Sequence, residues 1–82
     1  MKIDINKHIT VDSEICHGKP IFKGTRIMVW QVLEMMETGA SSKEIIKEYP
    51  SLTPEAIKAA LHYATQITRG NNNAIISLEV SS

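Results

Sequence analysis

The spacing of apolar and polar residues along this 82-residue chain predicts a short extended segment followed by three helices. Apolar and polar side chains alternate through residues 8–12, a pattern typical of a short β-strand. From Ile27 to about residue 38, apolar side chains occupy almost every helical position. A helix of this kind is buried on more than one side, and in so small a chain the second side suggests another subunit. Residues 1–7 are mixed and polar, and we interpret them as an arm that is frayed or ordered by a partner.

Local capping signals indicate where the predicted helices begin and end. Gly39 occupies the position of a left-handed C-cap for the first helix. Ser41, with a glutamate three residues later, forms a capping box that opens a second helix over about residues 42–49. Thr53 followed by Pro54 is typical of the start of a third helix, with threonine as the N-cap.

The third helix has a clear amphipathic stripe, and its predicted inward positions are Ala56, Ile57, Ala60, Leu61, Ala64 and Ile67. Gly70 after Arg69 predicts its end. Residues 71–82 then read as a C-terminal tail whose apolar alternation suits a strand or a flexible segment. The predicted organisation is one mainly α domain over residues 1–70, with a β arm in 1–26 and helices in 27–70.

Composition limits the class of protein. Hydrophobic residues make up 43% of the chain, which favours a folded domain over a disordered one. Nine basic and nine acidic residues cancel, so there is no overall positive charge to indicate nucleic-acid binding. A single cysteine and the lack of a long apolar run predict a cytoplasmic protein that is not in a membrane.

A glycine-rich basic loop over residues 18–26 precedes the first helix and carries Lys19, Lys23 and Arg26. It is a candidate binding loop. The alternative is that its glycines serve only turn geometry and its last residues only stabilise the helix.

Two short helices joined by a tight turn also match the plan of a helix-turn-helix, in which the helix from Pro54 would be the recognition helix in the major groove of DNA. The candidate DNA-binding residues on that helix are Lys58, His62, Gln66 and Arg69. The competing interpretation is a three-helix bundle whose polar face is merely solvated. Apolar side chains on the first helix predict a homodimer interface at Trp30, Leu33 and Met36.

The residues give no indication of an enzyme or a metalloprotein. No nucleophile has an evident base and orienting acid, and no His or Cys pair has zinc-ligand spacing. We therefore expect no catalytic residue, no metal site and no cofactor.

About two thirds of the chain, from residue 9 to 64, resembles the family called domain of unknown function 433, whose members are often described as VapB-like antitoxins. The motifs that carry the resemblance are Ile15-Cys16-His17-Gly18-Lys19-Pro20, Ile21-Phe22-Lys23-Gly24-Thr25-Arg26-Ile27, Val29-Trp30, Gly39-Ala40-Ser41, Glu48-Tyr49-Pro50-Ser51-Leu52-Thr53 and Ala59-Ala60-Leu61-His62-Tyr63-Ala64. Met28 departs from the family pattern, which usually has proline there. The resemblance implies a homeodomain-like helix-turn-helix fold with a small N-terminal β element.

The resemblance further implies the antitoxin of a type II toxin–antitoxin pair, which neutralises a PIN-like ribonuclease toxin and represses its own operon through operator DNA. Clustered carboxylates hold the metal in such nucleases, so Lys19, Lys23 and Arg26 are candidate toxin-binding residues. The tail, residues 71–82, is a competing candidate because it could add to a sheet edge on the toxin. The alternatives are a protein-interaction module that does not bind DNA and a stand-alone transcriptional regulator.

Overall fold

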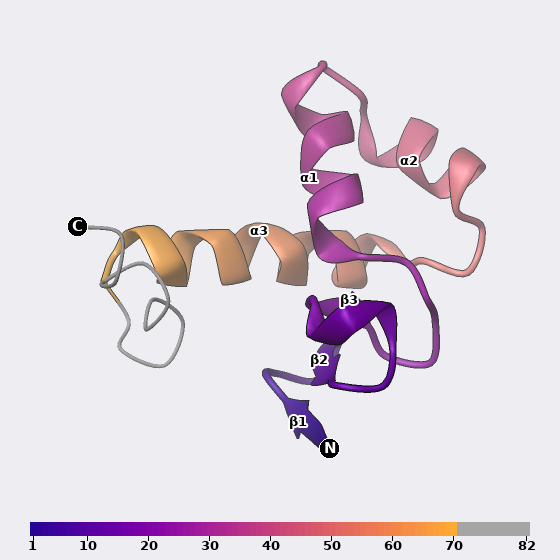
Figure 1. Cartoon of the computed structure of the whole chain (residues 1–82). Coiled ribbons are helices and arrows are strands. Elements are labelled where there is room, and N and C mark those ends of the chain that lie inside the picture. Colours follow the sequence, from indigo (N-terminus) through magenta and orange to yellow (C-terminus); the bar gives the residue numbers. More distant parts are fainter. Residues whose placement is uncertain (71–82) are drawn as a thin grey trace.

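The computed structural model of the chain describes residues 1–70, which form a small antiparallel sheet followed by three helices (Figure 1). The elements in chain order are β1 (Lys2–Asp4), β2 (Ile9–Asp12), the 3₁₀ helix η1 (Cys16–Gly18), β3 (Ile21–Phe22), α1 (Val29–Glu37), α2 (Ser42–Glu48) and α3 (Pro54–Thr68). This arrangement confirms the predicted three helices and N-terminal β element. The predicted tail, residues 71–82, lies outside the described residues.

The sheet has the strand order β1-β2-β3, and both strand pairs are antiparallel. The prediction that residues 1–7 form an arm that is frayed or ordered by a partner was wrong, because β1 pairs with β2 along its whole length, with Ile3 opposite Val11. The turn between the two strands is held by Asn6, whose side-chain oxygen accepts hydrogen bonds from the backbone N–H groups of His8 at 2.8 Å and Ile9 at 2.9 Å. An Asn side chain that caps its own turn in this way favours a tight hairpin.

Helix α1 begins at Val29, two residues later than predicted. The residue before it, Met28, is extended and forms a β-bridge with Ile21. The Val29 N–H donates to the Pro20 carbonyl at 2.9 Å, which ties the first turn of the helix to the basic loop. Extended pairing with the loop therefore takes Met28 out of the helix.

The predicted caps are confirmed. Gly39 has φ +95°, in the left-handed region that favours glycine. The Ser41 hydroxyl accepts from the Glu44 N–H at 3.2 Å, and the Glu44 carboxylate accepts from the Ser41 N–H at 2.9 Å. At the start of α3, the Thr53 hydroxyl accepts from the Ala56 N–H at 3.1 Å.

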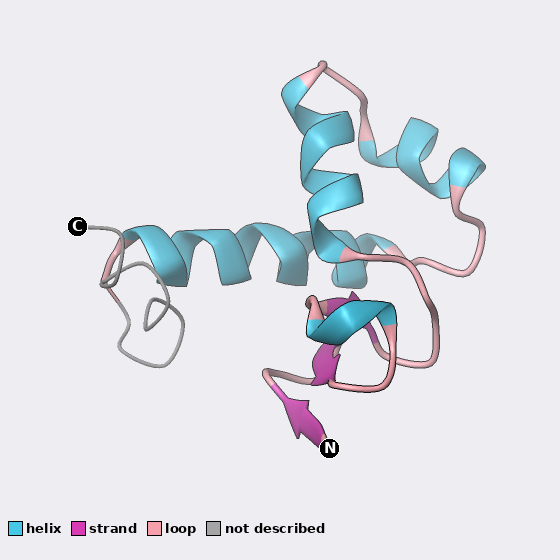
Figure 2. Ribbon diagram, viewed as in Figure 1, coloured by secondary structure: helices cyan, strands magenta, loops and turns pink. Residues whose placement is uncertain are grey.

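The sheet and all three helices, shown in Figure 2, each contribute side chains to the hydrophobic core. Its most deeply buried members come from every layer: Ile9, Phe22, Val29, Val32, Ile45, Ile57 and Ala60. Helix α3 crosses the base of α1 and then continues beyond the rest of the domain (Figure 1). Leu61, predicted to point inward, is 51% exposed, because the core covers only the Ala56, Ile57 and Ala60 side of this helix.

Residues 49–53 connect α2 to α3 without a helix or a strand. Within residues 1–70, none of the helices has the length and apolar character needed to cross a lipid bilayer.

Candidate functional site

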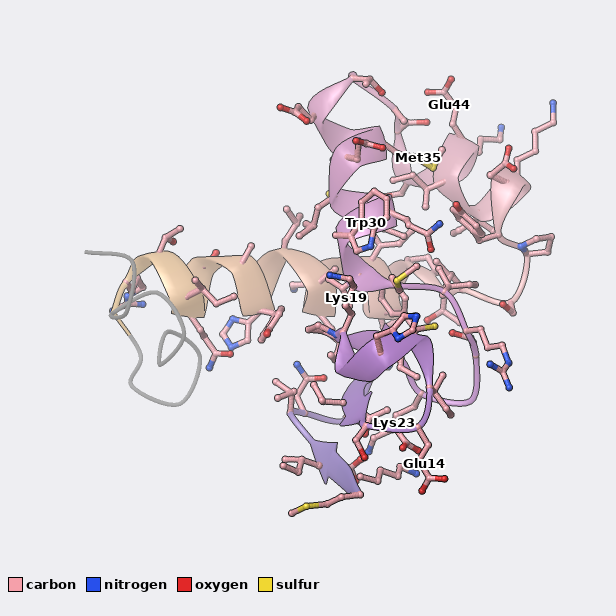
Figure 3. The ribbon with its side chains drawn as sticks, in the orientation of Figure 1. Glu14, Lys19, Lys23, Trp30, Met35 and Glu44 are labelled. Carbon is pink, nitrogen blue, oxygen red and sulfur yellow. The ribbon has the colours of Figure 1, made fainter. Side chains whose placement is uncertain are left out.

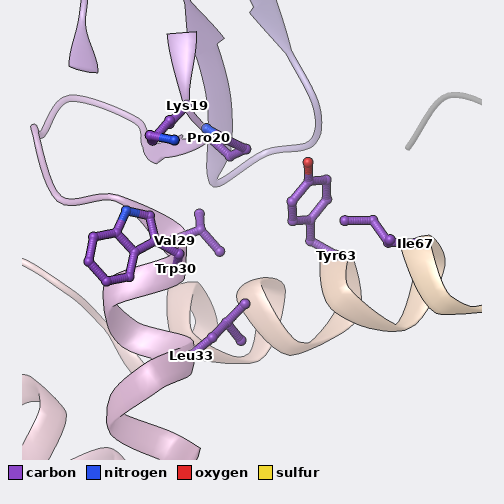
Figure 4. Close-up of a pocket in the computed structure, with 7 residues that line it drawn as sticks. All are labelled: Lys19, Pro20, Val29, Trp30, Leu33, Tyr63 and Ile67. Atoms are coloured by element: carbon purple, nitrogen blue, oxygen red, sulfur yellow. The ribbon is translucent and has the colours of Figure 1, made fainter. Parts of the chain in front are cut away.

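An apolar groove opens in the corner between α1 and the part of α3 that extends beyond the body (Figure 4). Its volume is about 500 Å³, within the range of binding pockets. Three segments supply its lining: the basic loop, α1 and α3. The lining residues are Lys19, Pro20, Val29, Trp30, Leu33, Tyr63 and Ile67.

The basic loop reaches the groove because η1 turns the chain sharply before it. Gly18 has φ +79°, and the Lys19 N–H donates to the Cys16 carbonyl at 3.2 Å. The bond from the Val29 N–H to the Pro20 carbonyl then fixes the loop against the start of α1. Lys19 is consequently the cation of the loop that lies beside the groove (Figure 3).

Trp30 forms the α1 side of the groove together with Leu33. The Trp30 indole N–H donates to the Met28 sulfur at 3.2 Å, and the residue is 48% exposed. A tryptophan held by such a contact and yet half exposed offers a large, ordered apolar surface, the kind of side chain that dominates binding at protein interfaces.

Tyr63 and Ile67 form the opposite side, one helical turn apart on α3. Burial raises the pKa of the Tyr63 hydroxyl, so this side of the groove carries a neutral phenol at physiological pH. Among residues 1–70, Lys19 is the only charged residue that lines the groove.

The three predicted toxin-binding cations do not form one cluster. Lys19 lines the groove, whereas the Lys23 ammonium lies 3.2 Å from the Asp4 carboxylate on the sheet. Arg26 is exposed and lines a separate hollow with Thr10 and other residues near the sheet. The Thr10 hydroxyl and then Lys23 hold the pKa of the Asp4 carboxyl below its ordinary value. Lys23 thus stabilises the hairpin through Asp4. Lys19 is the cation best placed to contact a partner bound in the groove.

The four predicted DNA-binding residues do form one stripe on α3. His62, Gln66 and Arg69 line a shallow hollow near the end of the helix, and Lys58 lies one turn before His62. Lys58, His62 and Arg69 are exposed, while Gln66 is half-buried.

The predicted dimer residues divide between two environments. Trp30 and Leu33 line the groove, whereas Met36 is not among its lining residues; Leu33 and Met36 are both partly buried against the core. In residues 1–70, no three His, Cys, Asp or Glu side chains gather closely enough to hold a metal ion.

A family model described as a protein of unknown function (DUF433) matches residues 9–64. The chain belongs to the DUF433 family. The uncharacterized protein y4eO of Sinorhizobium fredii is 34% identical over 56 residues, which are 68% of this chain and 25% of that protein. The chain therefore spans about a quarter of the length of this relative.

A solved structure has the same fold as this DUF433 domain. The crystal structure of a DUF433 member from Anabaena variabilis matches with a TM-score of 0.71 and 32% sequence identity, over 95% of this chain and 72% of that one. Most groove residues lie inside the DUF433 match, whereas Ile67 and strand β1 lie outside it.

Sequence reasoning identified Trp30, Leu33 and Lys19 but did not place them in one site. It missed Pro20 and Tyr63 as lining residues and assigned Ile67 only to the helix's inward face. An indication was available in the apolar i, i+4 pair of Tyr63 and Ile67 near the end of α3.

Proposed function

We propose that this DUF433 domain is the antitoxin of a type II toxin–antitoxin pair and binds a PIN-like ribonuclease through the groove between α1 and α3. The observation that carries the proposal is the half-exposed Trp30 in an apolar groove, where Lys19 is the one charged lining residue in the described part of the chain. Groove chemistry of this kind fits a partner segment that presents an apolar side chain next to a carboxylate.

The acidic site of a PIN-like nuclease supplies such chemistry, because it needs clustered carboxylates to hold a divalent cation. Lys19 at the groove would pair with one of those carboxylates while Trp30 and Leu33 cover apolar surface beside it. Arg26, on another part of the domain, would be a peripheral contact, and Lys23 would contribute by holding the hairpin. Occlusion of the nuclease site would then neutralise the toxin without any chemistry by the antitoxin.

Operator binding is the second part of the proposal and rests on the exposed stripe of Lys58, His62 and Arg69 on α3. In a helix-turn-helix, the second helix enters the major groove and contacts base edges. Glu55 in the first turn of α3 and the zero net charge of the chain both weaken attraction to phosphate. The charge distribution therefore favours a protein partner over DNA. A protein-interaction module without DNA binding is therefore the alternative function.

The predicted homodimer through Trp30, Leu33 and Met36 would use the same groove as the toxin. One surface cannot be covered by both partners at once. A dimer at this position would have to dissociate when the toxin binds, and this competition makes the two predictions separable by experiment.

Capture from the native host tests the proposal, with the domain tagged at its C-terminus. We expect mass spectrometry to identify a PIN-like nuclease in the bound fraction, and Trp30→Ala to weaken its binding at least about 30-fold, the effect of losing a hot-spot side chain. Leu61→Ala is the matched control, because Leu61 is equally exposed but lies outside the groove lining. Lys19→Glu should also weaken binding by reversing the charge.

The opposite outcomes would refute the proposal. If Trp30→Ala and Leu61→Ala weaken nuclease binding equally, the groove is not the toxin-binding surface. Loss of capture on deletion of residues 71–82, with Trp30→Ala harmless, would assign the toxin contact to the tail. Recovery of the domain without a nuclease would overturn the antitoxin function itself.

A further inference from the structure

Strand β1 lies at one edge of the sheet, and within residues 1–70 only β2 pairs with it (Figure 1). Residues 1–5 are all exposed. Their apolar members alternate along the strand, with Met1 78%, Ile3 52% and Ile5 36% exposed. Alternate side chains share one face of a strand, so this edge carries an uncovered apolar row.

The backbone of β1 also has hydrogen-bonding groups that point to the open edge. The Ser13 N–H donates to the Met1 carbonyl at 2.9 Å, and the Ile5 N–H donates to the Ile9 carbonyl at 2.9 Å. The backbone groups of residues 1, 3 and 5 therefore point toward β2. Because successive residues alternate in an antiparallel ladder, the N–H and C=O groups of Lys2 and Asp4 point away from β2.

We propose that β1 pairs with β1 of a second copy of this chain, antiparallel, around a two-fold axis at Ile3. In this register, Lys2 of each copy lies opposite Asp4 of the other, and their outward backbone groups exchange four hydrogen bonds. Ile3 then lies opposite Ile3 of the second copy. The two form a pair without backbone hydrogen bonds, the kind of pair in which side chains approach most closely. Met1 faces Ile5, so apolar and charged pairs separate onto the two faces.

The chain's own residues select this register. A shift by two residues places Lys2 opposite Lys2 in one direction and Asp4 opposite Asp4 in the other, and like charges directly opposite each other are destabilising. A shift by one residue brings the outward groups of one copy against residues whose backbone groups point inward. The self-complementary pattern of Lys2 and Asp4 about Ile3 is what identifies a second copy as the occupant.

Two further features bear on this pairing. The net charge of the chain is zero, so two copies do not repel each other overall. Two three-residue strands and their apolar row would bury less surface than the roughly 1,200–2,000 Å² buried in a stable interface. We therefore expect a weak dimer that forms only at high protein concentration. This surface is separate from the groove, and the inference does not depend on the proposed toxin.

Sedimentation velocity of the full chain, tagged at its C-terminus, tests the pairing from low micromolar to near-millimolar concentration. Lys2→Asp and Asp4→Lys each place like charges opposite one another in the homodimer, and we expect each to weaken dimerisation about tenfold or more. An equal mixture of the two variants restores opposite charges at both positions. We therefore expect the mixture to dimerise about as well as the unsubstituted chain.

Restored dimerisation in the mixture also shows that both variants are folded. As a second variant, Lys2→Pro removes an outward N–H while leaving the hydrogen bonds between β1 and β2 in place, and it should weaken the dimer as well. Lys2 has no ion pair within residues 1–70, so its substitution leaves the ion pair between Lys23 and Asp4 intact.

Three outcomes would overturn the inference. A chain that stays monomeric over the whole range has no such pairing. Single variants that dimerise as tightly as the unsubstituted chain, with no gain on mixing, exclude the β1 edge. If Trp30→Ala or deletion of residues 71–82 abolishes the dimer and the β1 variants do not, self-association belongs to the groove or to the tail.

Discussion

Removal of the Thr53 hydroxyl tests the physical account of α3, the helix that carries both one side of the groove and the predicted DNA-binding stripe. In the structure this hydroxyl accepts the Ala56 N–H at 3.1 Å in a partly buried setting. Thr53→Ala leaves that N–H without its partner, and the loss of an N-cap costs about 1 kcal/mol, within a range of roughly 0.5–2. In a domain of this size, about 1 kcal/mol corresponds to a fall in Tm of about 4–8 °C.

Thermal unfolding followed by circular dichroism measures the effect. Thr53→Ser keeps the accepting oxygen and should retain most of the stability. Thr68→Ala makes the same change at the other end of α3, where the exposed hydroxyl donates to the Ala64 and Thr65 carbonyls and caps no N–H group. We expect Thr68→Ala to change the free energy of unfolding by less than about 0.5 kcal/mol. Equal Tm values for Thr53→Ala and Thr68→Ala would refute the capping role.

Three further predictions concern other parts of the domain. Gly39→Ala should cost about 1–2 kcal/mol in chemical denaturation, because φ +95° strains any side chain although nothing lies within 4 Å of the added Cβ; an unchanged midpoint would contradict this. The pKa of Asp4 is held below its ordinary value of 3.8, first by the Thr10 hydroxyl, so its contribution to stability is present above that pH and lost as pH falls below it. Acid titration of Asp4→Asn should accordingly show a smaller loss of stability below pH 3.8 than the unsubstituted chain, and an identical profile would refute the linkage. If α3 binds operator DNA, Lys58→Ala and Arg69→Ala should each reduce the slope of log K against log salt by about 1, whereas unchanged slopes would exclude phosphate contacts at these residues.

The helix boundaries could be predicted from the sequence where local chemistry determines them. Ser41 with Glu44, Thr53 with Pro54, and Gly39 each act within a few residues, and the structure confirms these caps. Such signals do not depend on how the rest of the chain folds.

Features that depend on contacts distant in sequence were missed. Strand β1 is three residues long: Met1, Ile3 and Ile5 alternate with polar residues as in a strand, but so short a pattern does not reveal that Lys2–Asp4 pairs with residues 10–12. Helix α1 starts late because Met28 pairs with Ile21. Leu61 follows the same helical pattern as the buried positions, but its exposure is set by where the body of the domain lies against α3.

In the candidate groove, too, some residues could be predicted from the sequence, whereas others depend on how the helices pack. Trp30 and Leu33 could be chosen as surface residues because an apolar helix in a small chain needs more cover than one core provides. That Tyr63 and Ile67 lie opposite them depends on the crossing of α1 and α3, which the sequence pattern does not specify. Likewise, charge alone grouped Lys23 with Lys19, and only the hairpin geometry shows that Lys23 is paired with Asp4.

Trp30 is the chain's single tryptophan, and it lies half exposed in the groove. The domain therefore contains an intrinsic fluorophore at the proposed binding surface. A partner that displaces water from the indole should shift its emission to shorter wavelength, while events elsewhere on the domain leave it largely unchanged. Occupancy of this groove can thus be followed in the unlabelled protein by its ultraviolet emission alone.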